Sequence, residues 1–215
     1  MLHWETISEQ LKASLITLMK AEQLKDYRLV GGTALSLYLG HRMSVDIDLF
    51  ADAEKYGTID YAAIEVYLKD TFPFVSGDFG GDPAFGKSYL IGENPDNVVK
   101  LDIYYASESF VDDAQIIDNI RLASIQDIIA MKVDVIRRGG RKKDFWDLHE
   151  LLPRFSIPEM IAIHAKAYQW THDKALVRKN FINFKYADED FDPICLKNKE
   201  WVFIKEDIEE AAAQS

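Results

Sequence analysis

The stretch LVGGTALSLYLGHRMSVDIDLF, residues 29–50, decides how this chain folds. It begins as a short apolar strand, reaches the glycine pair Gly31–Gly32, and continues into a two-turn helix that Gly40 ends. A second strand then carries Asp46 and Asp48 between apolar residues. A strand, a glycine turn, a helix and another strand in this order predict an α+β fold with a mixed sheet.

The spacing of the two aspartates in this stretch predicts that their side chains act together. Residues two apart in a strand point to the same face, so Asp46 and Asp48 project together while Val45, Ile47 and Leu49 are expected to face the core. Two adjacent carboxylates repel each other and resist losing water. A Mg²⁺ ion between them relieves the repulsion, since Mg²⁺ prefers carboxylate, water and phosphate oxygens. The structural alternative is an edge strand whose acids face solvent.

The glycine pair suits phosphate. Gly31 and Gly32 end one strand and open a helix, for which we expect Thr33 to be the N-cap. Backbone amides at a helix N-terminus favour phosphate, and the missing Cβ atoms let it approach closely. A common tight turn is the alternative reading of the same residues.

A third acid, Asp102, lies in the apolar strand candidate NVVKLDIYYA. An isolated acid among strand formers needs a partner. Lys100, two residues away on the same face, would be a structural partner. The other interpretation makes Asp102 a third metal ligand on a neighbouring strand.

The rest of the chain divides into two regions. Helical spacing is expected over 5–25 and 58–70, with further strand candidates between 72 and 105. After about residue 115 we expect the chain to stay helical. We therefore predict a catalytic core of mixed sheet and helices over 1–115, with a helical region over 116–215 packed on it. The later helices are expected at 124–138, 142–152, 157–170, 174–186 and 202–213.

Charge and composition narrow the setting. The chain has 25 basic and 36 acidic residues, so its net charge of −11 is unusual for a protein that grips nucleic acid with its whole surface. The segment RRGGRKK, residues 137–143, is a local basic exception. The single Cys195 and the short apolar runs favour a cytoplasmic protein without a membrane segment.

The run GGTALSLYLGHRMSVDIDLF resembles the signature of the AbiEii/AbiGii abortive-infection toxins, which are nucleotidyltransferases of the DNA polymerase β-like superfamily. This run and the family signature share GGTAL, an Arg-x-Ser before Asp-x-Asp, and a following Leu-Phe. The resemblance covers about residues 28–152. It implies a nucleotidyltransferase-like sheet in which Asp46, Asp48 and Asp102 bind metal, while Gly31, Gly32 and Thr33 bind the nucleotide. We expect Arg42 to orient a carboxylate or touch phosphate, and Ser44 to cap the turn within the nucleotide site.

The segment MKVDVIRRGGRKKDFWDLHELL is similar to a later motif of the same family. Carried over by position, Lys132 is expected near the nucleotide phosphates, and Arg138 matches a spacer arginine. Asp144 and Asp147 match the two acids that close the motif, Asp147 with a catalytic role. Lys143 stands where the family usually has arginine. The alternative interpretations are that the apolar stem of Lys132 holds it on a half-buried helix, and that salt bridges join Asp144 to Arg141 and Asp147 to Lys143.

Together these residues predict transfer of a nucleoside monophosphate from an NTP to an acceptor, with Mg²⁺ or Mn²⁺ as cofactor. The resemblance implies a toxin opposed by an antitoxin protein, with RNA as the acceptor, as tRNA 3′ ends are in relatives. The basic segment 137–143 would then hold the RNA backbone. Lys132→Ala is expected to weaken NTP use without unfolding its helix. Two rival hypotheses are transfer to a small molecule such as an antibiotic hydroxyl, and a non-catalytic nucleotide-binding or interaction module.

Overall fold

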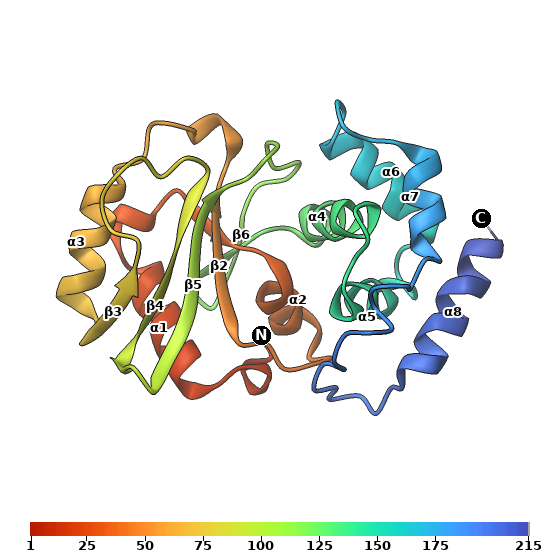
Figure 1. The fold of residues 1–215 in the computed structure, drawn as a ribbon, viewed down its shortest axis with the longest axis horizontal. Helices are drawn as coiled ribbons and strands as arrows, with labels where there is room; N and C mark the ends of the chain where they lie inside the picture. Colours follow the sequence, from red (N-terminus) through yellow and green to blue (C-terminus); the bar gives the residue numbers. More distant parts are fainter. Residues whose placement is uncertain (215) are drawn as a thin grey trace.

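A computed structural model describes residues 1–214, and Figure 1 shows a sheet-containing half beside a helical half. The α-helices are α1 (Glu9–Met19), α2 (Gly31–Leu39), α3 (Tyr61–Thr71), α4 (Ile125–Arg137), α5 (Lys142–Leu151), α6 (Ile157–Ala167), α7 (Lys174–Phe181) and α8 (Trp201–Ala213). The strands are β1 (Tyr27–Leu29), β2 (Asp46–Ala51), β3 (Phe74–Gly77), β4 (Gly86–Asn94), β5 (Asn97–Tyr105), β6 (Gln115–Ile117) and β7 (Ile120–Leu122). Within the described residues, no helix is long and apolar enough to cross a membrane.

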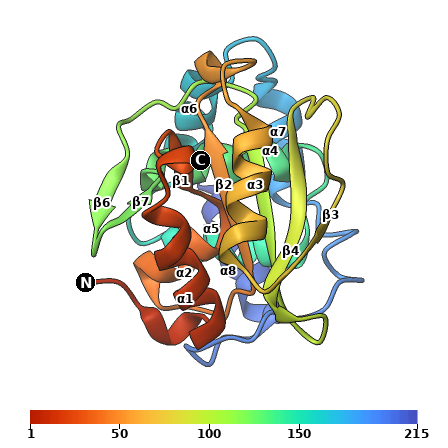
Figure 2. The same cartoon turned by 90° about the vertical axis from the view of Figure 1, so that its left-hand side faces the viewer.

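The strands form one mixed sheet in the order β3-β4-β5-β2-β1-β7-β6. The pairs β2–β5 and β1–β7 are parallel, and the other neighbours are antiparallel. Helices α1 and α3 cover one face, as Figure 2 shows from their side, while α2 and α4 lie on the other. The fully buried Ile47 and Leu49 alternate with the half-buried Asp46 and Asp48 along β2, whereas Val45 precedes the strand and is 70% exposed, so the expectation that it faces the core is wrong. The sheet therefore buries its apolar side chains on one face and keeps the acids on the face toward α2 and α4.

The stretch 29–50 folds as its pattern predicts. Helix α2 ends at Gly40, whose φ of 64° is the left-handed conformation that glycine adopts most easily. The helix expected over 5–25 is shorter, because Ser8 starts α1 by accepting a hydrogen bond from the Leu11 amide. Single 3-10 turns at Trp4–Thr6 and Glu22–Leu24 take up the flanking residues.

The expectation that the chain stays helical after residue 115 is wrong. Asp118 and Asn119 have φ of 52° and 64°, which suits a two-residue hairpin turn, and they join β6 to β7. Strand β7 pairs with β1 through Leu29 and Leu122, so it completes the sheet. We therefore propose that the division between core and helical region falls after Leu122 instead of at residue 115.

Candidate active site

The three predicted acids project from two neighbouring strands. In the parallel pair β2–β5, Asp48 lies opposite Asp102 and Asp46 lies opposite Lys100. Opposed residues of a sheet share a face, as do residues two apart along a strand. Asp46, Asp48 and Asp102 consequently all lie on the face toward α2 and α4.

Charged neighbours affect two of these acids, Asp48 and Asp102. Burial raises the pKa of Asp48 to about 6, and the charges of Asp102 and Asp46 raise it in the same direction. The Asp102 side chain is only 16% exposed, and its Oδ2 accepts a hydrogen bond of 2.5 Å from Lys100 Nζ. The structural partner expected for Asp102 is thus present. Its other oxygen, Oδ1, is buried and has no hydrogen-bond partner among the described residues.

The three acids are candidate ligands for a metal ion. Among residues 1–214, no three His, Cys, Asp or Glu side chains are gathered closely enough to hold a metal. The donor set nevertheless fits Mg²⁺, because it consists of carboxylates and includes the unpaired Oδ1 of Asp102. The raised pKa of Asp48 marks a concentration of negative charge that a cation would relieve.

The glycine pair Gly31–Gly32 packs against charged side chains. Gly31 has φ of 69°, and a Cβ on it would lie 2.6 Å from Asp48 Oδ2. A Cβ on Gly32 would collide with Nη2 of Arg42. Helix α2 starts at Gly31, and its N-cap residue Val30 provides no side-chain cap. Glycine is therefore required at both positions, and the first amides of α2 lie beside Asp48.

Thr33 and Ser44 take another role than the one expected. Thr33 is not the N-cap, because the helix already begins at Gly31. Its buried hydroxyl lies 2.5 Å from the backbone oxygen of Asp46 and 2.8 Å from Ser44 Oγ. The two hydroxyls thus tie α2 to the start of β2.

The later motif forms a buried charge cluster of Arg42, Lys132, Asp144, Asp147 and His41, hereafter the charge cluster. Asp147 is fully buried, and its two carboxylate oxygens accept hydrogen bonds of 2.6 and 2.8 Å from the Arg42 guanidinium. His41 Nε2 lies 2.8 Å from the same carboxylate. Lys132 Nζ lies 2.7 Å from Asp144 Oδ1 and 2.7 Å from Asp147 Oδ2.

The electrostatics of the charge cluster follow from burial opposed by pairing. Burial alone would raise the pKa of Asp147, but the charges of Lys132 and Arg42 hold it well below its usual range. Burial alone would lower the pKa of Lys132, and the charges of Asp147 and Asp144 raise it instead. Arg42, Lys132, Asp144 and Asp147 are therefore ionised near neutral pH, two of them positive and two negative.

The cluster changes three expectations. Arg42 orients a carboxylate, as one of its two expected roles required, and its guanidinium is not aimed at phosphate. Asp147 cannot touch a substrate because it is fully enclosed, so a direct catalytic role is wrong and we assign it a positioning role. Salt bridges were expected to join Asp147 to Lys143 and Asp144 to Arg141. Instead Asp147 pairs with Lys132 and Arg42, while Asp144 pairs mainly with Lys132 and lies 3.7 Å from Arg141.

A cavity of about 310 Å³ joins the two motifs. It lies between the start of α2, strand β2, helix α4 and the start of α5. The predicted residues that line it are Gly31, Gly32, Asp48, Lys132, Arg138 and Asp144. Arg141 and Lys143 of the basic segment line it too, whereas Lys142 turns away to pair with Asp192 at 2.7 Å.

Several lining residues were not predicted from the sequence. Phe50 lines the cavity two residues beyond Asp48, and that spacing could have indicated it. Asp134 lies between residues of the later motif, and Tyr168 follows α6 with no signal in the sequence. His41, which was not predicted as a site residue, belongs to the charge cluster.

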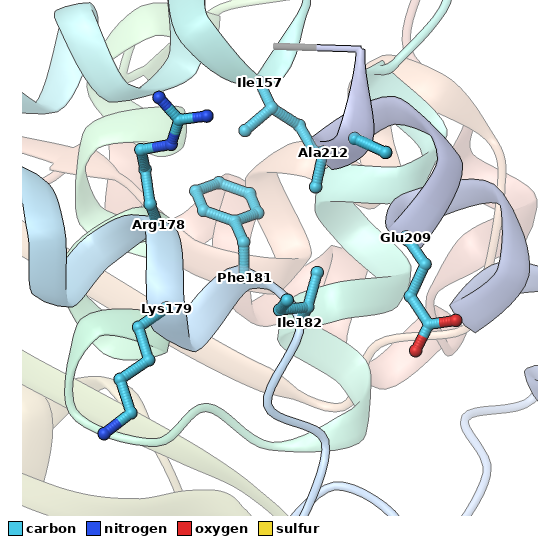
Figure 3. Close-up of a pocket in the computed structure, with 8 residues that line it drawn as sticks. Ile157, Arg178, Lys179, Phe181, Ile182, Glu209 and Ala212 are labelled. Atoms are coloured by element: carbon cyan, nitrogen blue, oxygen red, sulfur yellow. The ribbon is translucent and has the colours of Figure 1, made fainter.

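A second cavity, of about 510 Å³, lies among α6, α7 and α8. Figure 3 shows Phe181 of α7 and the following residue Ile182 facing Ala212 and Glu209 of α8 across it. None of the predicted site residues lines this cavity. Asp48, the glycine turn and the basic side chains meet at the smaller cavity, which is therefore the candidate active site, whereas Asp46 and Asp102 do not line it.

Comparisons with known proteins identify the family of this chain. The family model described as "Nucleotidyl transferase AbiEii toxin, Type IV TA system" matches residues 15–214. The protein named "Uncharacterized protein aq_aa25" of Aquifex aeolicus (strain VF5) is 30% identical over 177 residues, 77% of each chain.

Two solved structures have a similar fold. JHP933 from Helicobacter pylori superposes with a TM-score of 0.59 at 19% identity, over 97% of this chain and 92% of that one. MenT4, the nucleotidyltransferase toxin Rv2826c from Mycobacterium tuberculosis H37Rv, gives a TM-score of 0.62 at 12% identity, over 93% and 78%. At such identities the likeness concerns the fold alone, and it confirms the predicted nucleotidyltransferase-like α+β architecture.

Proposed function

Because this chain belongs to the AbiEii family of nucleotidyltransferase toxins, we propose that it transfers a nucleoside monophosphate from a Mg²⁺-bound NTP to an RNA acceptor. Family membership makes the chain a nucleotidyltransferase; the metal, the acceptor and the residue roles are our proposal. The observation that carries it is the cavity in which the glycine turn, Asp48 and the cations of the later motif meet.

Asp46, Asp48 and Asp102 would hold the metal, which is Mg²⁺ with Mn²⁺ as an alternative. When bound, such an ion offsets the charge that develops on the transferred phosphoryl group. Asp102 has a second task, since its buried Oδ1 has no partner among the described residues and can accept the proton of the attacking hydroxyl. Lys100 pairs with its other oxygen, Oδ2.

The phosphates would lie between the glycine turn and the cations of the cavity. The amides of Gly31 and Gly32 open α2 without a side-chain cap, which leaves them available to phosphate oxygens. Lys132 lines the same cavity from α4. Asp144 and Asp147 hold Lys132 in place, and Arg42 fixes Asp147 in turn. This arrangement keeps a cation in fixed geometry, as phosphoryl transfer requires.

The acceptor is proposed from the rim of the cavity. Arg138 and Arg141 line the cavity, and their side chains are 63% and 65% exposed. Exposed arginines beside the reacting groups suit an RNA backbone. The net charge of −11 favours the second candidate, a cationic small molecule that carries a hydroxyl.

The family description also supports a cellular role. We propose that the protein acts in the cytoplasm as a toxin, and that a cognate antitoxin protein opposes it. Expression of the chain with and without the product of its neighbouring gene would test this, with growth of the host cell as the measurement.

The chemistry is tested by incubating the pure protein with each labelled NTP, Mg²⁺ and either total RNA or a hydroxyl-bearing cationic antibiotic. We expect label to enter RNA. Asp48→Asn should lower transfer roughly 100-fold or more, because it removes a metal ligand, and should leave stability unchanged or slightly higher. Full activity of Asp48→Asn in Mg²⁺ would show that this acid is structural.

The acceptor is tested with a paired variant and a matched control. Arg138→Gln with Arg141→Gln should reduce RNA labelling and lower the slope of log rate against log salt by about two. Arg154→Gln with Lys20→Gln removes the same charge from exposed positions that line none of the described cavities. If both double variants label RNA like the wild type at every salt concentration, the small-molecule candidate replaces RNA.

A further inference from the structure

The candidate active-site cavity has two unlike ends. One end carries Gly31, Gly32, Asp48 and Lys132, and the other carries the apolar side chains of Phe50, Met131 and Tyr168, with the paired Asp134 and Arg138 beside Tyr168. Phe50 follows Asp48 by two residues on the same face of β2, so it lies roughly 6–7 Å further along the strand. The apolar end is therefore continuous with the end that would hold phosphates.

Tyr168 presents a fixed aromatic surface at this end. Its ring stacks on His164 at 4.7 Å between centroids with only 7° between the planes. His164 is itself held, because its Nδ1 lies 2.7 Å from His172 and its Nε2 lies 3.6 Å from Asp134. One face of Tyr168 is thus covered by His164, while the ring still lines the cavity.

Phe50 provides the apolar surface on the sheet side. It is half-buried and contacts Tyr104, its register partner on β5, at 5.9 Å between ring centroids. Met131 of α4, also half-buried, adds a polarisable thioether to the same cavity. Aromatic rings and methionine pack well on flat π-systems, whereas a triphosphate gains nothing from them.

We infer that this apolar end, formed by Phe50, Met131 and Tyr168, binds the nucleoside of the NTP, with its base packed on Tyr168. The inference rests on the proposed function, since it assigns the remaining part of the same substrate. It also orients the NTP: the base lies toward α6, and the triphosphate lies toward the start of α2. Ser107, which lines the cavity and interacts with the Tyr168 hydroxyl, is the polar group nearest the base edge.

The test compares two ligands that differ only in the nucleoside. Equilibrium binding is measured in Mg²⁺ for a non-hydrolysable α,β-methylene NTP and for inorganic tripolyphosphate. Tyr168→Leu and Phe50→Leu should each weaken binding of the nucleotide analogue roughly 10-fold, the loss expected for a stacked base. Both should bind tripolyphosphate like the wild type, and Tyr168→Phe should bind both ligands normally.

Trp170→Leu is the matched control, because Trp170 is 90% exposed and does not line this cavity. Equal losses for both ligands in Tyr168→Leu and Phe50→Leu would overturn the inference, since they would show damage to the whole cavity. Unchanged binding of the nucleotide analogue would overturn it as well.

The outcome separates the inference from the proposed function. If the wild type binds neither ligand, the proposed function fails and the inference fails with it. If the wild type binds the nucleotide analogue and the Leu variants bind it equally well, only the inference fails. Selective loss in the Leu variants supports the inference even if no acceptor is ever labelled.

Discussion

The buried position of Asp147 predicts a large and specific loss of stability in the variant Asp147→Asn. The substitution conserves the shape of the side chain but removes a negative charge that pairs with Arg42 and Lys132. Both cations are nearly inaccessible to water, so they cannot regain hydration without a rearrangement. Asp144 would be the one carboxylate left to the cluster among the described residues.

The expected cost follows from that geometry. Removing one partner of a buried ion pair typically costs about 3–5 kcal/mol, because it leaves an uncompensated charge in the interior. Domains of this kind are stable by about 5–15 kcal/mol, so Asp147→Asn should lose about a fifth or more of that total. The free energy of unfolding from urea titrations measures the loss directly.

The control is an ion pair of similar length on the surface. Lys25 Nζ lies 2.5 Å from Glu22 Oε1, but Glu22 is 79% exposed. Glu22→Gln should therefore change the free energy of unfolding by less than about 1 kcal/mol. A loss for Asp147→Asn as small as that of Glu22→Gln would refute the reasoning, because it would mean that water reaches Arg42 and Lys132.

Two further predictions concern the glycine turn and the pH dependence. Gly31→Ala and Gly57→Ala both place a side chain at φ near +70°, which costs about 1–2 kcal/mol of stability. Only the new side chain of Gly31→Ala would also collide with Asp48. We therefore expect transfer activity to fall in Gly31→Ala and not in Gly57→Ala. Burial raises the pKa of Asp134, but its pairing with His164, Arg137 and Arg138 outweighs burial and lowers the pKa to about 2. This carboxylate should therefore stabilise the fold by about 2 kcal/mol above pH 4 and lose that contribution as pH falls toward 2. Unfolding of Asp134→Asn should consequently depend less on pH over that interval, and an unchanged dependence would contradict the assignment.

The parts of the fold that the sequence predicts are those set by local spacing. The period of two places Asp46 and Asp48 on one face, and Gly40 ends α2 where a left-handed residue is needed. The hairpin of β6 and β7 was missed because each strand has three residues, too few for a periodic pattern. Its Asp118–Asn119 turn was the available signal.

The site residues that sequence reasoning misjudged depend on distant partners. Arg42 and Asp147 are separated by 105 positions, so no local pattern could show that they bind each other instead of substrate. Thr33 follows a glycine pair that itself starts the helix, which moves Thr33 two residues inward. The acids of a motif can therefore be recognised from the sequence, but whether they face substrate or a buried cation depends on tertiary packing.

The balance of charge in the charge cluster indicates that Lys143, and not Lys132, is the cation available to an incoming anion. Lys132 is already matched by Asp144 and Asp147, and Lys132→Ala would leave two carboxylates buried close together, so the expectation that it spares the fold needs revision. Lys143 lines the same cavity, and among the described residues it forms no ion pair. Burial lowers its pKa, and the charges of Arg141 and Lys132 lower it further, so it gains most from an incoming anion.

Lys143→Gln should therefore weaken NTP binding roughly 10- to 100-fold, as expected for a lost charge-assisted hydrogen bond, with little change in the free energy of unfolding. Lys132→Met should lower stability as well as binding, because its carboxylates lose their cation. Binding titrations and urea unfolding on both variants separate the two roles. Undiminished NTP binding in Lys143→Gln would show that the phosphates lie elsewhere in the cavity.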